Sequence, residues 1–165
     1  MKVLILVRHA KSSWADAGLA DRDRPLNARG KRDAPWIGDF LKRQELVPDV
    51  ILTSPAVRAE KTARKLAAAM GFDKRRIEVR EEIYEAGTDQ LRQLVAGLDP
   101  AVSRASLVGH NPVLTDFANE LTGATIDNIP TAGIVAVEFD AEDWSRAGQG
   151  RLLLFASPPK GAPAD

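Results

Sequence analysis

The chain has 165 residues, which suffices for one domain with a substantial core and is short for two. Its 23 basic and 23 acidic side chains balance, which argues against binding nucleic acid or an acidic membrane through overall charge. The absence of cysteine excludes disulfides, thiolate metal ligands and a cysteine nucleophile.

The beginning of the chain resembles a signal peptide only briefly. The apolar run after Lys2 covers residues 3–7 and then meets two basic residues, so it is shorter than the apolar region of a signal peptide. No later run approaches the ~20 apolar residues of a membrane-spanning helix. We therefore expect a cytoplasmic protein without a membrane partner.

Short apolar segments alternate with segments of helical periodicity, which is typical of an α/β protein with a mostly parallel sheet. The last two predicted strands follow each other with no strong helix between them, and this indicates an antiparallel pair at one edge. Strands are predicted at residues 3–7, 49–54, 76–79, 105–110, 133–139 and 151–157.

Four helices are predicted between these strands. Ser54, Thr88 and Asn111 are expected to cap three of them, and proline follows the first and the last of these caps. The fourth helix lies around residues 34–41, with Pro35 in its first turn or at a kink. The expected ranges of the three capped helices are 54–71, 88–98 and 111–123, where the first and last end at a glycine.

Residues 12–26 show neither a helical nor a strand period, and a connection of this length is often functional. Arg22 and Arg24 lie within it. These two arginines could contact substrate, or they could be solvated or structural. The solvated or structural role is favoured.

Several basic residues stand where predicted strands end. Arg8, His9 and Lys11 follow the first strand, Arg58 lies in the first turn after the second, and His110 ends the fourth. Ligands of parallel α/β sheets bind outside the carboxyl ends of the strands. Arginine forks and helix N-termini there favour an anion, so we expect a phosphoryl site.

Histidine is the best-placed nucleophile at this edge, because the chain has no Cys-x5-Arg or Walker pattern. His9 can attack only when it is neutral, and Arg8 and Arg58 nearby should lower its pKa. We see no convincing metal-ligand cluster and therefore expect neither a metal nor another cofactor.

The segments "LILVRHAKSSW", "DRDRPLNARG", "VILTSPAVRAEKTA", "IYEAG" and "LVGHNP", in this order, resemble the histidine phosphatase superfamily over about residues 1–140. The first segment is similar, more narrowly, to the SixA-type phosphohistidine phosphatases, which share Ala10 in place of the superfamily's glycine. The resemblance implies a three-layer α/β sandwich of the phosphoglycerate mutase type, with a mostly parallel central sheet and an antiparallel edge strand. We expect one domain at 1–158 and a flexible tail at 159–165.

The resemblance also implies roles for single residues. His9 would become phosphorylated, Arg8 and Arg58 would hold the phosphoryl oxygens, and His110 would complete the pocket. Glu85 matches the position of a general acid. SixA-type members can lack such an acid, and Glu81 and Glu82 lie close by in the sequence. A solvated surface glutamate without a catalytic role is an equally weighted alternative for Glu85. Further substrate-binding candidates are Lys11, Ser12 and Asn111.

These observations predict a phosphatase that works through a phosphohistidine enzyme intermediate. The chain is short for subdomains that would enclose a small metabolite, which favours phosphohistidine on a protein as substrate. The alternative is a general phosphomonoesterase of small metabolites. A mutase would ask for a closed site, and a non-catalytic phosphate-binding module would have no use for His9. A monomer is favoured.

Overall fold

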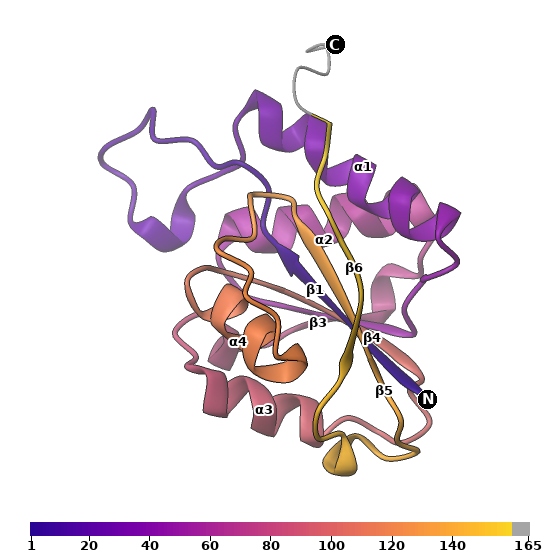
Figure 1. Cartoon of the computed structure of the whole chain (residues 1–165). Coiled ribbons are helices and arrows are strands. Elements are labelled where there is room, and N and C mark those ends of the chain that lie inside the picture. The colour runs from indigo at the N-terminus through magenta and orange to yellow at the C-terminus, as the bar shows by residue number, and fades with distance from the viewer. Residues whose placement is uncertain (160–165) are drawn as a thin grey trace.

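The computed structural model describes residues 1–159 (Figure 1). Four strands, β3, β2, β4 and β1, run parallel, while β5 is antiparallel to both of its neighbours, β1 and β6. The predicted α/β sheet with an antiparallel edge is thereby confirmed. The strands, in the order in which they lie in the sheet, are β3 (Ile77–Val79), β2 (Val50–Thr53), β4 (Arg104–Gly109), β1 (Lys2–Arg8), β5 (Ile134–Phe139) and β6 (Arg151–Ala156).

Helices cover both faces of the sheet (Figure 1). One face carries α1 (Ala28–Arg43) and α2 (Val57–Met70), and the other carries α3 (Thr88–Ala96) and α4 (Val113–Thr122). Four short 3-10 helices complete the elements: η1 (Asp21–Asp23), η2 (Lys74–Arg76), η3 (Glu81–Ile83) and η4 (Trp144–Arg146). Within residues 1–159, no helix is long and apolar enough to cross a membrane.

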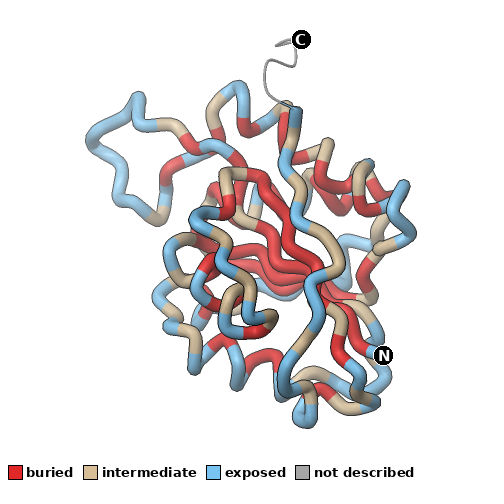
Figure 2. The backbone as a smooth tube through the Cα atoms, viewed as in Figure 1, coloured by how far each residue is buried: buried red, intermediate tan, exposed pale blue. Residues whose placement is uncertain are grey.

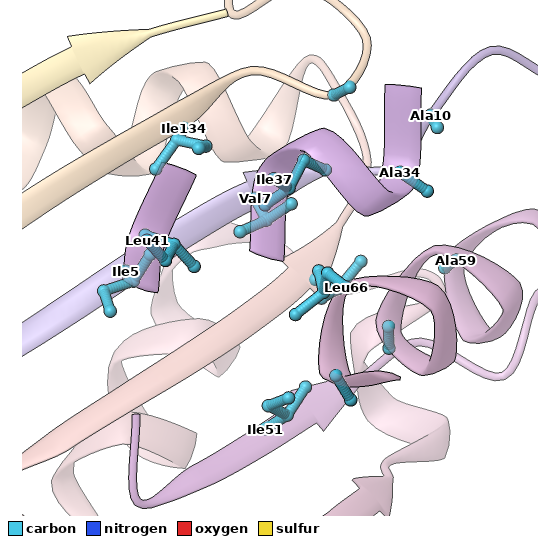
Figure 3. Close-up of a cluster of buried hydrophobic side chains, with 14 of the residues drawn as sticks. Ile5, Val7, Ala10, Ala34, Ile37, Leu41, Ile51, Ala59, Leu66 and Ile134 are labelled. Carbon is cyan, nitrogen blue, oxygen red and sulfur yellow. The ribbon is translucent and has the colours of Figure 1, made fainter. Parts of the chain in front are cut away.

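Strand β1 lies in the middle of this sandwich and is apolar on both sides, as a central parallel strand must be. Ile5 and Val7 face the layer of α1 and α2, where Ile37 and Leu66 pack against them (Figure 3). Leu4 and Leu6 belong to the opposite core, and Figure 2 shows the buried strands between the more exposed helices. A well-packed central strand gives the residues that follow it a fixed position.

The helix starts differ from the predicted ones. Helix α2 begins at Val57 rather than at Ser54, and α4 begins at Val113. Thr88 is the first residue of α3 rather than its cap, and Leu98 lies beyond the end of that helix. The predictions placed caps by residue type alone, whereas the hydroxyls of Ser54 and Thr88 have partners elsewhere in the chain.

Pro35 lies in the interior of α1, not in its first turn. The helix starts earlier than predicted because the Asn27 side chain accepts a hydrogen bond from the Gly30 amide, 2.9 Å away. Gly30 lies so close to the main-chain oxygen of Lys11 that a Cβ atom would collide with it. Helix α1 therefore packs directly on the segment that follows β1. Of the predicted tail, all but Pro159 lies outside the described residues.

Candidate active site

The register of the sheet brings the two histidines together. Arg8 of β1 lies opposite Gly109 of β4, so His9 and His110 leave neighbouring strands side by side. Their ring centroids are 5.2 Å apart. The expectation that both histidines lie at the carboxyl edge of the parallel strands is therefore met.

A cavity of about 240 Å³ opens at this edge. It includes seven of the eight predicted site residues, and Glu85 is the one that does not line it. Three further side chains complete the wall, of which Arg24 and Trp14 come from the long loop. The lining residues are Arg8, His9, Lys11, Ser12, Trp14, Arg24, Arg58, His110, Asn111 and Thr131.

His9 is 7% exposed, and its Nδ1 lies 2.8 Å from the carbonyl oxygen of Ala10. A carbonyl can only accept, so Nδ1 carries the hydrogen and Nε2 keeps its lone pair. Arg58 donates from Nε to that atom over 3.4 Å. Burial, as the largest cause, together with the smaller electrostatic effects of His110, Arg58 and Arg8, lowers the pKa of His9 to about 3 against the opposing effect of the bond to Ala10. His9 is thus neutral at pH 7, with burial as a larger cause than the arginines named from the sequence.

Arg58 is held by a residue that the sequence did not single out. Its Nη1 donates to the main-chain oxygen of Asp21 at 2.7 Å, and its Nη2 donates to the carboxylate at 3.0 Å. The Tyr84 hydroxyl also donates to this carboxylate, at 2.7 Å. Tyr84 and then Arg58 lower the pKa of Asp21 to about 2, so Asp21 is ionised and fixes the arginine.

Arg22 and Arg24 differ in their environment. Arg24 is 7% exposed, lines the cavity, and donates to the hydroxyl of Ser12 at 2.8 Å. Its Nε donates to Asp21 at 3.2 Å. Arg22 does not line the cavity and pairs with Glu81 near the surface. The favoured interpretation of a solvated or structural role therefore fits Arg22, whereas Arg24 belongs to the site.

His110 is 9% exposed, and its Nε2 lies 2.7 Å from the hydroxyl oxygen of Ser54. The Ser54 hydroxyl oxygen already accepts a hydrogen bond from the amide of Ala56 at 3.2 Å. Within residues 1–159, Nε2 of His110 is the acceptor available to the Ser54 hydroxyl hydrogen. Satisfying both groups puts the His110 hydrogen on Nδ1, which is buried without a protein partner in the described chain. Burial and then the charge of Arg58 lower the pKa of His110 to about 4. His110 is therefore a neutral side chain with a donor to spare.

Arg8 and Asn111 flank this pair. Arg8 donates from Nη1 to the carbonyl of Ile129 at 2.9 Å, while its Nε has no partner among the described residues. Asn111 donates to that carbonyl at 2.9 Å and to Asn128 at 3.0 Å, and its oxygen accepts two bonds from Thr115. All amide positions of Asn111 are used, so a contact with a ligand would require exchanging one of them.

Glu85 is exposed and lines an adjoining cavity of about 650 Å³, which also reaches His110 and Asn111. A general acid must come within hydrogen-bond reach of the leaving group. Its role stays a prediction, as does that of exposed Lys11. In the described part of the chain, no three histidine, aspartate or glutamate side chains are grouped so that they could hold a metal ion.

Comparison with known proteins assigns this arrangement to a family. Residues 4–98, more than half of the chain, match the model of the histidine phosphatase superfamily (branch 1). An uncharacterised protein of Mycobacterium tuberculosis is 32% identical and covers 90% of this chain and 96% of its own length. An uncharacterised chloroplastic protein of Arabidopsis thaliana is 30% identical, over 87% of this chain and 69% of its own.

The solved structures agree with this assignment. The crystal structure of a proposed phosphohistidine phosphatase SixA from Agrobacterium tumefaciens is 30% identical, covers 96% of this chain and 99% of its own, and superposes with a TM-score of 0.82. A protein histidine phosphatase SixA in complex with tungstate, 24% identical, shares the fold with a TM-score of 0.77 over 94% of this chain and 96% of its own. The chain therefore belongs to the histidine phosphatase superfamily, in its SixA-type branch, and is a phosphatase.

Proposed function

We propose that this phosphatase removes the phosphoryl group from phosphohistidine on proteins, with His9 as the nucleophile. The observation that carries the proposal is the state of His9. A buried, neutral imidazole keeps its Nε2 lone pair because Nδ1 donates to Ala10, and it lies in a cavity with Arg8 and Arg58. A neutral nucleophile beside fixed cations suits attack on a phosphoryl dianion.

The reaction has two steps. The Nε2 lone pair of His9 forms a bond to phosphorus, and the bond from phosphorus to the leaving group breaks with its electron pair passing to the leaving atom. The oxygen of a water molecule then attacks the phosphoryl group on His9 and gives up a proton to solvent. The P–N bond breaks with its electron pair returning to Nε2, and inorganic phosphate and neutral His9 result. Arg8, Arg58 and His110, which line the same cavity, would stabilise the oxygens in both steps.

The choice of substrate follows from the protonation of the leaving group. An alkoxide leaves poorly without a proton, whereas the imidazole of phosphohistidine can carry its proton before cleavage. Asp21, the carboxyl bound to Arg58, has a pKa of about 2 and holds no proton to give at pH 7. Among residues 1–159, no aspartate or glutamate lines the cavity around His9. A site without an acid favours phosphohistidine, and the likeness to the Agrobacterium tumefaciens SixA supports the same substrate.

The second candidate is a phosphomonoesterase of small phosphorylated metabolites. One observation favours it: Glu85 shares the adjoining cavity with His110, so a leaving group reaching into that cavity could receive its proton from Glu85.

Phosphate release should be compared for a phosphohistidine peptide, phenyl phosphate and glycerol phosphate. We expect turnover to be greatest for the first, and a preference for glycerol phosphate would replace this proposal by the second candidate. Rapid quench with labelled substrate should trap a base-stable, acid-labile phosphoenzyme. His9→Ala should abolish the phosphoenzyme and turnover while orthophosphate still binds, and a phosphoenzyme that persists in this variant would exclude His9 as the nucleophile.

A further inference from the structure

Trp14 is the tryptophan that the core does not explain. Of the three tryptophans, Trp144 is 1% exposed, and Trp36 stacks on Phe40 with ring centroids 5.0 Å apart. Trp14 is 73% exposed, yet it lines the cavity that contains His9. A large apolar ring left in water at the mouth of a site is informative, because proteins usually bury such a side chain at least in part.

The ring is nevertheless held in place. The guanidinium carbon of Arg24 lies 3.5 Å from its centroid, which is a close cation–π contact. Arg24 cannot move freely, since it is buried and bonded to Ser12 and Asp21. The two ends of the loop that carries Trp14 are also joined, because Ser12 forms a β-bridge with Leu26. Most of the Trp14 side chain is thus open to a ligand but already oriented.

The loop around Trp14 projects from the body of the molecule, in violet at the left of Figure 1. Its inner end reaches the catalytic cavity through Ser12, Trp14 and Arg24. Apart from the imidazoles of His9 and His110, Trp14 is the one aromatic side chain among the described residues that line this cavity. It is therefore the group there that could recognise a flat ring outside the phosphoryl pocket.

We propose that Trp14, supported by Arg24, forms a subsite that stacks against the planar leaving group of the substrate, an imidazole or an aryl ring. The inference deepens the proposed function, on which its choice of imidazole rests. When phosphorus is next to Nε2 of His9, the leaving group lies on the far side of phosphorus, outward from the buried histidine. A flat ring gains from stacking on an indole, whereas an alkyl chain has no face to offer.

The subsite can be tested without turnover by using phosphonates, because a phosphatase does not hydrolyse their P–C bond and only binding is measured. Phenylphosphonate carries a ring and methylphosphonate does not, and their binding can be measured by calorimetry. Trp14→Ala should weaken phenylphosphonate binding about three- to tenfold, the range expected for loss of an aromatic stack. Binding of methylphosphonate and of orthophosphate should stay unchanged, and Trp14→Phe should restore most of the loss.

Leu19 provides the matched control, because it is 38% exposed in the same loop and does not line the cavity. Leu19→Ala should change neither phosphonate. Equal weakening of both phosphonates by Trp14→Ala would show that Trp14 acts only by holding Arg24, and no weakening of either would exclude any contact; both results overturn the subsite.

Kinetics separate this inference from the proposed function. With the phosphohistidine peptide, Trp14→Ala should raise KM about three- to tenfold and leave kcat nearly unchanged, because stacking contributes equally to the ground state and the transition state. A wild type that cleaves no phosphohistidine but shows the phenylphosphonate effect would refute the substrate and leave the ring subsite standing. Normal phosphohistidine turnover with no effect of Trp14→Ala would support the proposed substrate and refute the ring subsite.

Discussion

Lowering the pH from 7 to 5 tests the central feature of the site, the neutrality of its two histidines. Burial holds the pKa of His9 at about 3 and that of His110 at about 4, whereas an unfolded histidine titrates near 6.5. Because the chain contains only these two histidines, its imidazole NMR spectrum should contain two sets of ring signals. Neither should move between pH 7 and 5, and the nitrogen shifts should show hydrogen on Nδ1 of both rings.

The same pKa shifts predict how stability depends on pH. Below pH 6.5 the unfolded chain takes up a proton on each histidine and the folded protein does not. The free energy of unfolding therefore decreases as the pH is lowered, and the protein has its full stability from these two groups only above pH 6.5. Between pH 7 and 5 each histidine should remove about 2 kcal/mol, or about 4 kcal/mol for the pair. Both side chains are more than nine-tenths buried, so solvent screening reduces this little.

Urea unfolding at pH 7 and pH 5 measures this loss. The wild type should lose about 4 kcal/mol and His9→Gln about 2 kcal/mol, since the variant has one buried imidazole fewer. The quantity compared is the change in unfolding free energy between pH 7 and pH 5 within each protein, so a pH-independent effect of the substitution on stability cancels. A His9 signal that titrates near pH 6.5, or an equal loss in the two proteins, would refute the reasoning that burial keeps His9 neutral.

Three further predictions concern the groups around the histidines. Ser54→Ala should leave His110 as a mixture of tautomers, which its nitrogen chemical shifts would report. It should also lower kcat/KM by about tenfold, because the hydrogen bond from His110 to the charged phosphoryl group would be weakened. Unchanged shifts would refute the assigned tautomer. If Glu85 is a general acid, Glu85→Gln should slow glycerol phosphate most, phenyl phosphate less and phosphohistidine least, whereas equal losses would make it structural. Chelator treatment should leave turnover unchanged, and activity lost to a chelator and regained with a divalent ion would contradict metal-free catalysis.

The sequence sufficed to predict the fold and to place both histidines at one edge of the sheet, because both depend on local pattern and on one topological rule. Strands such as 3–7 are apolar on both sides and short, which identifies a parallel sheet before any partner is known. Residues directly after such strands must gather at one edge. Arg8, His9 and His110 needed no further information to be brought together.

The parts that the sequence missed depend on contacts between distant segments. Ser54 looks like a helix cap, but its partner His110 lies 56 positions later, and no local statistic contains that pair. In "DRDR" the sequence does not distinguish one arginine or one aspartate from the other, yet Asp21 and Arg24 contact the site while Arg22 pairs at the surface. Their different positions follow from the bend of the loop at η1 and from the partners Arg58 and Ser12.

The charges of the site explain how a chain of zero net charge can select an anion. Three buried or partly buried arginines, Arg8, Arg24 and Arg58, line the cavity, and Asp21 is the carboxylate bonded to two of them. With both histidines neutral and exposed Lys11 set aside, two positive charges remain without a counterion among these residues. A phosphoryl dianion would cancel them. A protonated His9 would add a further positive charge and remove the lone pair, so the same burial that lowers its pKa both limits repulsion in the cavity and preserves the lone pair that the proposed mechanism requires.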